Sequence, residues 1–326
     1  MRATFSGRRR RILTRGRLTG AARVAVTAGL LAALVAKLSP GEIARAIGDA
    51  RPWPFVSAAL VLALVQGLVV VKWWWLARGR GIDAGGHLLG RSYFLANLLT
   101  TVLPTAIGGD VYRIYRVSRD ASARTADVTM SVLFERATGY GAMASLGALG
   151  AAFYFGGTGA GMALLAAGLL LAPVALAAVD RVWLPRLPSG HRLRTVVRDR
   201  AELRRLVWMT LLSLGIQALY ISSIALIGLA FGVEASWWYW ASSVAVVAAA
   251  TLIPLSLGGL GIRESGFAAL LSRQSGSAAA GASVGFALGA LLALVSAVAL
   301  VALEAASRLE TAPRRAMRAS AREAEA

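Results

Sequence analysis

Apolar residues in this chain occur in uninterrupted runs of about 20, separated by short polar stretches. A helix of about 20 apolar residues crosses about 30 Å of hydrocarbon, so each run predicts a transmembrane helix. Two further apolar stretches, about 88–107 and 237–260, each lead into a Gly-Gly pair. The pattern predicts an all-α polytopic membrane protein. Six runs are expected to be spans: 22–38, 54–76, 128–155, 160–179, 206–231 and 282–305.

The arginine content of the loops indicates their side of the membrane, because cytoplasmic loops are enriched in Lys and Arg. The loop 77–91 has three Arg against one Asp, and 111–127 has four Arg against two Asp. Both are expected in the cytoplasm, so the stretch 88–107 between them is expected to be re-entrant. The loop 180–205, with eight Arg against three acids, is also expected inside.

The C-terminal half gives the mirror image of this arrangement. The tail 307–326 has five Arg against three Glu and is expected inside, whereas 232–236 is expected outside. The stretch 237–260 must then be re-entrant from the outside. Six spans and two re-entrant hairpins form two halves, about 22–155 and 160–306, that are related as an inverted-topology repeat. The alternative is eight plain spans, which would make the halves parallel.

Composition agrees with this class, since 57% of the residues are hydrophobic and only 16% are charged. The net charge of +19 could indicate nucleic-acid binding, but Arg-rich cytoplasmic loops account for it more simply. The chain then divides into a basic cytoplasmic tail (1–21), one transmembrane domain (22–306) and a cytoplasmic C-terminal tail (307–326). There is no cysteine, which excludes disulfides and thiolate chemistry.

One motif occurs twice at an offset of 150 residues: 101–113 reads TVLPTAIGGDVYR and 251–263 reads TLIPLSLGGLGIR. Proline and paired glycines break a helix, and broken backbone at membrane depth is tolerated only against protein or a wet cavity. A helix that restarts after Gly-Gly presents free N–H groups to an anion. An arginine one turn later adds donors that match phosphate.

The candidate substrate-binding residues come from these motifs and from a charged pair within span 128–155, since ionisable residues inside a membrane are functional candidates. They are Pro104, Gly108, Gly109, Asp110, Arg113, Glu135, Arg136, Pro254, Gly258, Gly259, Arg263 and Glu264. The alternative is that the glycines only allow close helix packing and the arginines reach the interface. Gln66 and Asn97 are interpreted as hydrogen-bonding groups between helices.

Other chemistry has no support in the sequence. There is no phosphate-loop or hydrolase motif, and the two histidines, His87 and His191, stand alone without metal-ligand spacing. No catalytic residue, metal or cofactor is therefore predicted.

Three blocks carry a resemblance: NLLTTVLPTAIGGDVYRIYRVSR (97–119), SVLFERATGYGA (131–142) and LIPLSLGGLGIRESGFAALL (252–271). They resemble the lysylphosphatidylglycerol synthase transmembrane-domain family, also called flippase-like, and the resemblance covers about 20–310. It implies a membrane domain that moves a lipid between leaflets. Bifunctional members flip the aminoacylated phosphatidylglycerol made by their soluble synthase domain. We expect a stand-alone member without that domain, whose lipid need not be lysylphosphatidylglycerol.

We expect a transporter of the bacterial inner membrane, with both termini in the cytoplasm, that moves an anionic phospholipid or a polyprenyl-phosphate-linked lipid. Our hypothesis is that Arg113 and Arg263 bind the lipid phosphate alternately from the two leaflets, while Asp110, Glu135 and Glu264 balance the charge or carry a coupling proton. One alternative is a membrane-embedded transferase with Asp110 as base. Another is a non-catalytic partner of a lipid-modifying enzyme or glycosyltransferase. The expected partners are membrane lipids and not nucleic acid, and the sequence does not indicate an oligomeric state.

Overall fold

The computed structural model describes most of the expected membrane domain. The described residues are 48–102, 108–156, 200–252, 256, 258–275 and 277–324, with the isolated positions 29 and 41. They form eight helices and contain no strand, which confirms the predicted all-α class. The expected spans 22–38 and 160–179 lie outside the described residues, as do Pro104, Pro254 and most of the loop 180–205.

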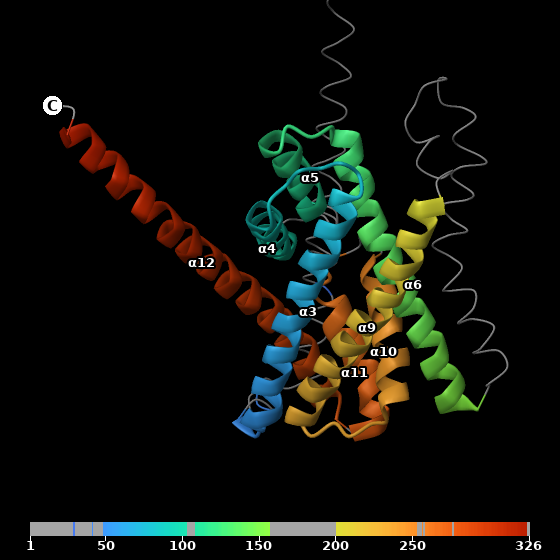
Figure 1. Ribbon diagram of the computed structural model, residues 1–326. Coiled ribbons are helices and arrows are strands. Elements are labelled where there is room, and N and C mark those ends of the chain that lie inside the picture. Colours follow the sequence, from blue (N-terminus) through green and yellow to red (C-terminus); the bar gives the residue numbers. More distant parts are fainter. Residues whose placement is uncertain are drawn as a thin grey trace, which may run out of the picture.

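The helices follow one another with short connections within the described part of the chain (Figure 1). Their bounds are α3 Pro52–Arg78, α4 Gly86–Val102, α5 Gly108–Asp120, α6 Thr125–Phe155, α9 Arg200–Ala230, α10 Trp237–Leu252, α11 Ile262–Ser275 and α12 Ala278–Ala324.

Three of the described helices are long and apolar enough to cross a membrane: Pro52–Arg78, Trp208–Ala230 and Ala278–Arg308. They coincide with the predicted spans 54–76, 206–231 and 282–305. The predicted span 128–155 is helical in α6, which has 31 residues. Its glycines and polar residues make it less apolar than the other three, so its crossing of the membrane stays a prediction.

The glycines of α6 serve helix packing. A Cβ at Gly150 would lie 2.4 Å from the carbonyl oxygen of Trp238, and one at Gly147 would lie 2.2 Å from the Cβ of Ala245. Both neighbours belong to α10. Without a hydrophobic driving force in lipid, helices associate through such close contacts between small residues. The same glycines that lower the hydropathy of α6 therefore hold it against α10.

The helices α4 and α5 form a packed pair at the end of the molecule where α3 ends and α6 begins (Figure 1). A Cβ at Gly109 would lie 2.3 Å from the carbonyl oxygen of Ala96, so only glycine allows this approach of α5 to α4. Ile82, before α4, is buried in an apolar cluster, and Ala123, after α5, packs against the same cluster. The chain thus enters and leaves this pair on the same side of the helical body.

The second pair, α10 and α11, lies toward the other end of the body, where α9 ends and α12 begins (Figure 1). The turn between the two helices needs glycine, since Gly258, Gly259 and Gly261 have φ values of 53°, 78° and 84°. The hydroxyl of Tyr239 on α10 donates a hydrogen bond to the carbonyl oxygen of Leu270 on α11. This bond joins the two helices near the outer ends of the pair.

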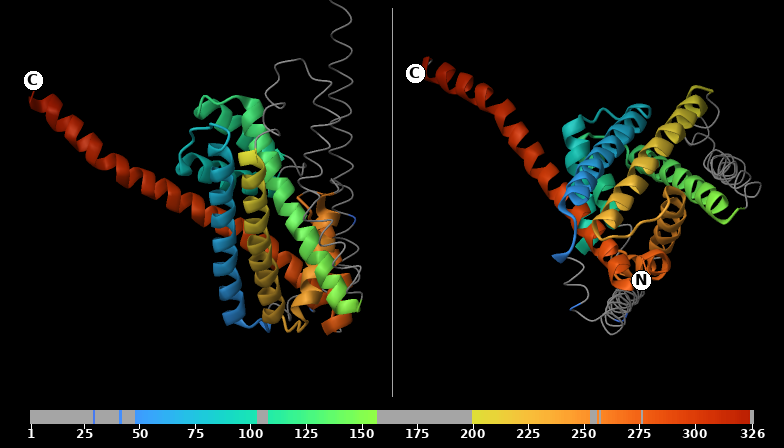
Figure 2. Two further views of the ribbon diagram at one scale, coloured as in Figure 1. Left: turned by 45° about the vertical axis from the view of Figure 1, so that its right-hand side comes forward. Right: turned by 90° about the horizontal axis from the view of Figure 1, so that it is seen from below.

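The last helix, α12, has 47 residues and is much longer than the others. It begins beside α11 and packs against α4 further along, and its C-terminal part extends beyond the other helices (Figure 2). At the α4 crossing, Arg91 pairs with Glu304 at 3.6 Å, and His87 and the carbonyl oxygen of Leu303 are within hydrogen-bond distance.

Gly109→Ala tests the close contact of α4 with α5. The added methyl group would overlap a backbone oxygen, which cannot move aside cheaply, so we expect a loss of about 1–3 kcal/mol of stability. Gly215→Ala on α9 is the control, because no atom lies within 4 Å of its Cβ position and alanine favours helix by up to about 1 kcal/mol. Thermal unfolding in detergent should give midpoint shifts of opposite sign. Equal midpoints for the two variants would contradict the contact.

Candidate functional site

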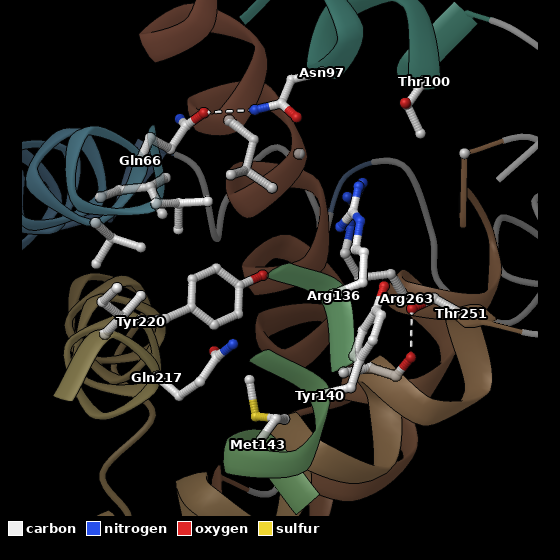
Figure 3. Close-up of a pocket in the computed structure, with 18 of the residues that line it drawn as sticks. Gln66, Asn97, Thr100, Arg136, Tyr140, Met143, Gln217, Tyr220, Thr251 and Arg263 are labelled. Atoms are coloured by element: carbon white, nitrogen blue, oxygen red, sulfur yellow. Dashed lines mark hydrogen bonds between the residues drawn. The ribbon is translucent and has the colours of Figure 1, made fainter. Parts of the chain in front are cut away.

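A cavity of about 340 Å³ lies between the two helix pairs and is lined by residues of α3, α4, α6, α9, α10, α11 and α12. Arg136 of α6 and Arg263 of α11 both line it (Figure 3). Thr100, next to the first copy of the repeated motif, and Thr251, in the second copy, lie on its wall as well. The cavity is therefore built by both halves of the sequence repeat.

The first motif places its arginine away from this cavity. The side chain of Arg113 is only 1% exposed, and its Nη2 lies 2.7 Å from Oε2 of Glu135. Its Nε donates to Oδ1 of Asp110 at 2.9 Å, and its guanidinium lies 4.8 Å from the ring centre of Trp73. Two carboxylates and an aromatic face thus enclose this cation, and it is not among the residues that line the cavity.

Arg136 takes the position facing the cavity instead. It donates to both oxygens of Asp110, at 3.0 and 3.2 Å, and its side chain is 39% exposed. Asp110 therefore bridges two arginines, one enclosed and one accessible. We call Asp110, Arg113, Glu135 and Arg136 the arginine cluster. The structure brings together four of the candidate residues from α5 and α6.

A buried lysine supports the arginine cluster. The ammonium group of Lys72 donates to Oγ of Ser213 at 3.0 Å, to the backbone oxygen of Glu135 at 3.1 Å and to Oγ1 of Thr138 at 3.3 Å. These bonds connect α3, α6 and α9 next to the arginine cluster. Sequence reasoning did not select Lys72, although a charged residue in an apolar span is itself a signal of a functional or structural site.

The second motif arranges its charges differently. Arg263 donates to Oε1 of Glu264 at 2.8 and 3.1 Å, and Oε2 of Glu264 accepts from the backbone N–H of Gly261 at 2.6 Å. Glu264 is fully buried, whereas Arg263 is 14% exposed. A Cβ at Gly289 of α12 would lie 2.2 Å from Nη2 of Arg263, so glycine leaves room there for the guanidinium.

The equivalent arginines of the repeat therefore have different surroundings, Arg113 enclosed and Arg263 at the cavity. Of the motif glycines, Gly258 lines the cavity, while Gly109 and Gly259 lie against α4 and Thr251 respectively. Gly108 is half-buried at the first position of α5. The alternative that the motif glycines allow close helix packing is thus supported at Gly109.

Uncharged polar groups complete the wall. Asn97 Nδ2 donates to Oε1 of Gln66 at 2.8 Å, which confirms these two as a hydrogen bond between α4 and α3. Tyr140, Gln217 and Tyr220 also line the cavity, and sequence reasoning did not select them (Figure 3). Single polar residues spread over long apolar helices have no spacing that could have identified them.

The arrangement is suited to holding an anion. Two guanidinium groups line one small cavity among membrane helices, where the low dielectric strengthens charge-assisted hydrogen bonds. Among the described residues, no group of three or more His, Asp and Glu side chains could hold a metal ion. The site offers a ligand arginine donors, neutral hydrogen-bonding groups and the carboxylate of Glu135.

Arg113→Gln tests the arginine cluster. Loss of this cation leaves Glu135 buried without its closest partner, so we expect a loss of about 3–5 kcal/mol of stability. Adding Glu135→Gln to the same chain removes the uncompensated carboxylate and should restore part of that loss. Unfolding by denaturant in detergent measures both variants. A single variant as stable as the unmodified protein would contradict the enclosed position of Arg113.

Comparison with known families agrees with this architecture. The family model for the lysylphosphatidylglycerol synthase TM region matches residues 20–300, which include all the candidate residues. No curated protein matches the chain. The match covers most of the sequence and both copies of the repeated motif, so the chain belongs to the lysylphosphatidylglycerol synthase TM region family.

Proposed function

We propose that this protein is a flippase-like transporter that moves an anionic phospholipid or a polyprenyl-phosphate-linked lipid between the leaflets of the bacterial inner membrane. The observation that carries the proposal is the cavity lined by both Arg136 and Arg263. A phosphate cannot cross hydrocarbon without replacing its water shell. Arginine donors from both halves of the domain supply such a replacement, and inverted repeats bind substrate where the two halves meet.

In this mechanism Arg136 takes the role first assigned to Arg113. Arg113 is enclosed by Asp110 and Glu135, so it positions the cluster rather than contacting the lipid. Asp110 holds the guanidinium of Arg136 at the cavity, and Glu264 holds that of Arg263. Carboxylates thus orient both arginines: Asp110 orients Arg136, with Oε2 of Glu135 at 4.0 Å from its Nε, and Glu264 orients Arg263. In the proposed mechanism their remaining donors bind the headgroup.

The two helix pairs fit the role of re-entrant hairpins. The chain enters and leaves the α4–α5 pair on one side of the body, and the α10–α11 pair lies toward the other end (Figure 1). Hairpins from opposite faces would place the two Gly-Gly turns near the cavity at mid-depth, and Gly258 does line it. We therefore propose six spans with two re-entrant hairpins, and cytoplasmic termini.

The transferase alternative has less support. A general base needs an oxygen that can accept a proton from the substrate. Both oxygens of Asp110 accept hydrogen bonds from Arg113 or Arg136. The transferase and the partner role are both kept as outcomes of the transport experiment below.

Arg136→Gln tests the transport role. In liposomes carrying fluorescent phosphatidylglycerol, a membrane-impermeant reductant bleaches only the outer leaflet, so the slow phase of bleaching reports headgroup crossing. We expect at least tenfold slower crossing for the variant, because a phosphate-binding cation is lost. Arg116→Gln is the matched control: this arginine pairs with Asp120 at 2.7 Å and does not line the cavity.

Three outcomes count against the proposal. Equal crossing rates for Arg136→Gln and the unmodified protein would remove the arginine from the mechanism. Product formation from a lipid-linked substrate without any crossing would favour the transferase. A stable complex with a lipid-modifying enzyme, required for any effect, would favour the partner role.

Single cysteines test the re-entrant hairpins, since the chain has no cysteine of its own. Asp83→Cys and Thr125→Cys, on either side of the α4–α5 pair, should react with a membrane-impermeant maleimide from the cytoplasmic side only. Glu234→Cys and Arg273→Cys, around the α10–α11 pair, should react from the outside only. Eight plain spans would place Asp83 and Thr125 on opposite sides of the membrane.

A further inference from the structure

A second cavity lies outside the transport mechanism. It has a volume of about 620 Å³ and is formed by the start of α3, the residue that follows α9 and the N-terminal part of α12. These segments lie at the end of the body away from the α4–α5 pair (Figure 1). Gly289 lines the first cavity and its neighbour Ala290 lines the second. The two cavities therefore lie against different faces of α12.

The wall of the second cavity is almost entirely apolar. Phe55 of α3, Phe231 after α9 and Phe286 of α12 line it. Among its described residues, Ser283 has the one hydroxyl group, which is bonded to the carbonyl oxygen of Ala279 at 2.9 Å. A ligand therefore meets mainly carbon atoms and no free hydroxyl group of the described wall. A cavity of this size with an apolar lining is suited to an alkyl chain.

One cation lines this otherwise apolar cavity. Arg51 directly precedes α3 and is exposed, and its backbone N–H donates to the carbonyl oxygen of Ala230 at 2.8 Å. This bond fixes the start of α3 against the end of α9. The side chain of Arg51 makes no capping hydrogen bond to α3, and it has no ion pair among the described residues. Its guanidinium donors are therefore available to an anion.

Aromatic residues place this end of the molecule at a membrane interface. Trp53, two residues after Arg51, is 75% exposed. At the same end, the rings of Phe153 on α6 and Trp238 on α10 are stacked with their centres 4.5 Å apart (Figure 1). Tryptophan concentrates at the depth of the lipid headgroups. Arg51 thus lies at phosphate depth, and Phe55 lies about 6 Å further along the helix axis, at 1.5 Å per residue.

We infer that the second cavity binds one acyl chain of a glycerophospholipid whose phosphate pairs with Arg51. The phosphate supplies the anion that Arg51 lacks among the described residues, and the acyl chain covers the apolar wall. Basic groups beside pockets between membrane helices are suited to lipid headgroups. The inference goes beyond the proposed transport and does not rest on it, since a lipid can be bound here without crossing the membrane. On the proposed topology the site lies in the outer leaflet.

Photo-crosslinking tests the acyl-chain site. Phosphatidylglycerol with a diazirine in the middle of one acyl chain is incorporated into liposomes with the full-length protein, and mass spectrometry measures the labelling of Phe231 relative to Leu294. Leu294 is 57% exposed on α12 and lines neither cavity, so its labelling reports contact with bulk lipid. We expect Phe231 to be labelled more strongly than Leu294. Equal or weaker labelling of Phe231, as when another segment or a partner fills the cavity, would overturn the inference.

A cavity-filling variant tests the same site. Ala290 is exposed and lines the cavity, so Ala290→Trp places an indole ring in the space of the acyl chain. The labelling of Phe231 relative to Leu294 should fall several-fold. Ala297→Trp is the matched control, because Ala297 is exposed two turns further along α12 and lines neither cavity. An equal ratio in the two variants would contradict an acyl chain in this cavity.

Arg51→Gln tests the phosphate contact. The labelling of Phe231 by phosphatidylglycerol should fall about fivefold, as expected for one lost hydrogen bond. Diacylglycerol with the same diazirine chain has no phosphate, so its labelling of Phe231 should not change. Arg78→Gln, at the other end of α3, is the control and should change neither value. If Arg51→Gln altered the labelling by both lipids equally, Arg51 would have no role in binding the phosphate.

Discussion

The burial of Arg113 is the constraint on which the site depends. A guanidinium cannot lose a proton and must be neutralised where it is removed from water. Asp110 on its own helix and Glu135 on α6 provide this neutralisation, which fixes α5 against α6. Asp110 then has lone pairs left for Arg136. The buried Arg113 thus holds Asp110 in place, and Asp110 in turn holds the accessible Arg136 at the cavity.

Close approach of helices provides the second condition. Gly109 allows α5 to contact α4, and Gly285 and Gly289 allow α12 to contact α11 at Glu264 and Arg263. Arg263 and Glu264 are thus held where α11 and α12 come within contact distance at a glycine. The charges and the small residues therefore act together: the small residues bring the backbones close, and the ion pairs set which faces meet.

The sequence pattern reaches a definite limit. Long apolar runs predicted the three clear spans, and the 150-residue repeat identified Arg113, Arg263 and their neighbouring acids. The repeat could not show that Arg113 is enclosed, because its partner Glu135 comes from another helix, whereas Arg263 is paired with the adjacent Glu264. Equal positions in a repeat also need not share backbone geometry, since α5 begins at Gly108 whereas Gly258 and Gly259 lie in a turn before α11.

Lys72 and the cavity tyrosines escaped prediction for a related reason. Lys72 precedes three tryptophans, a composition that is typical of a membrane interface, and its partners lie on α6 and α9. A contact between residues so far apart in the sequence produces no regular spacing that a sequence pattern could reveal. By contrast, a hydrogen bond at Gln66 and Asn97 could be expected from general physics, since an isolated amide in an apolar helix needs a polar partner.

The length of α12 has a mechanical consequence. Its first turns lie beside Arg263 at Gly289, while its far end extends beyond the other helices (Figure 2). From Gly289 to Ala324 the helix runs about 50 Å at 1.5 Å per residue. The same helix packs against α11 at its start and against α4 where Glu304 pairs with Arg91. A single continuous helix therefore sets how far apart the two helix pairs lie.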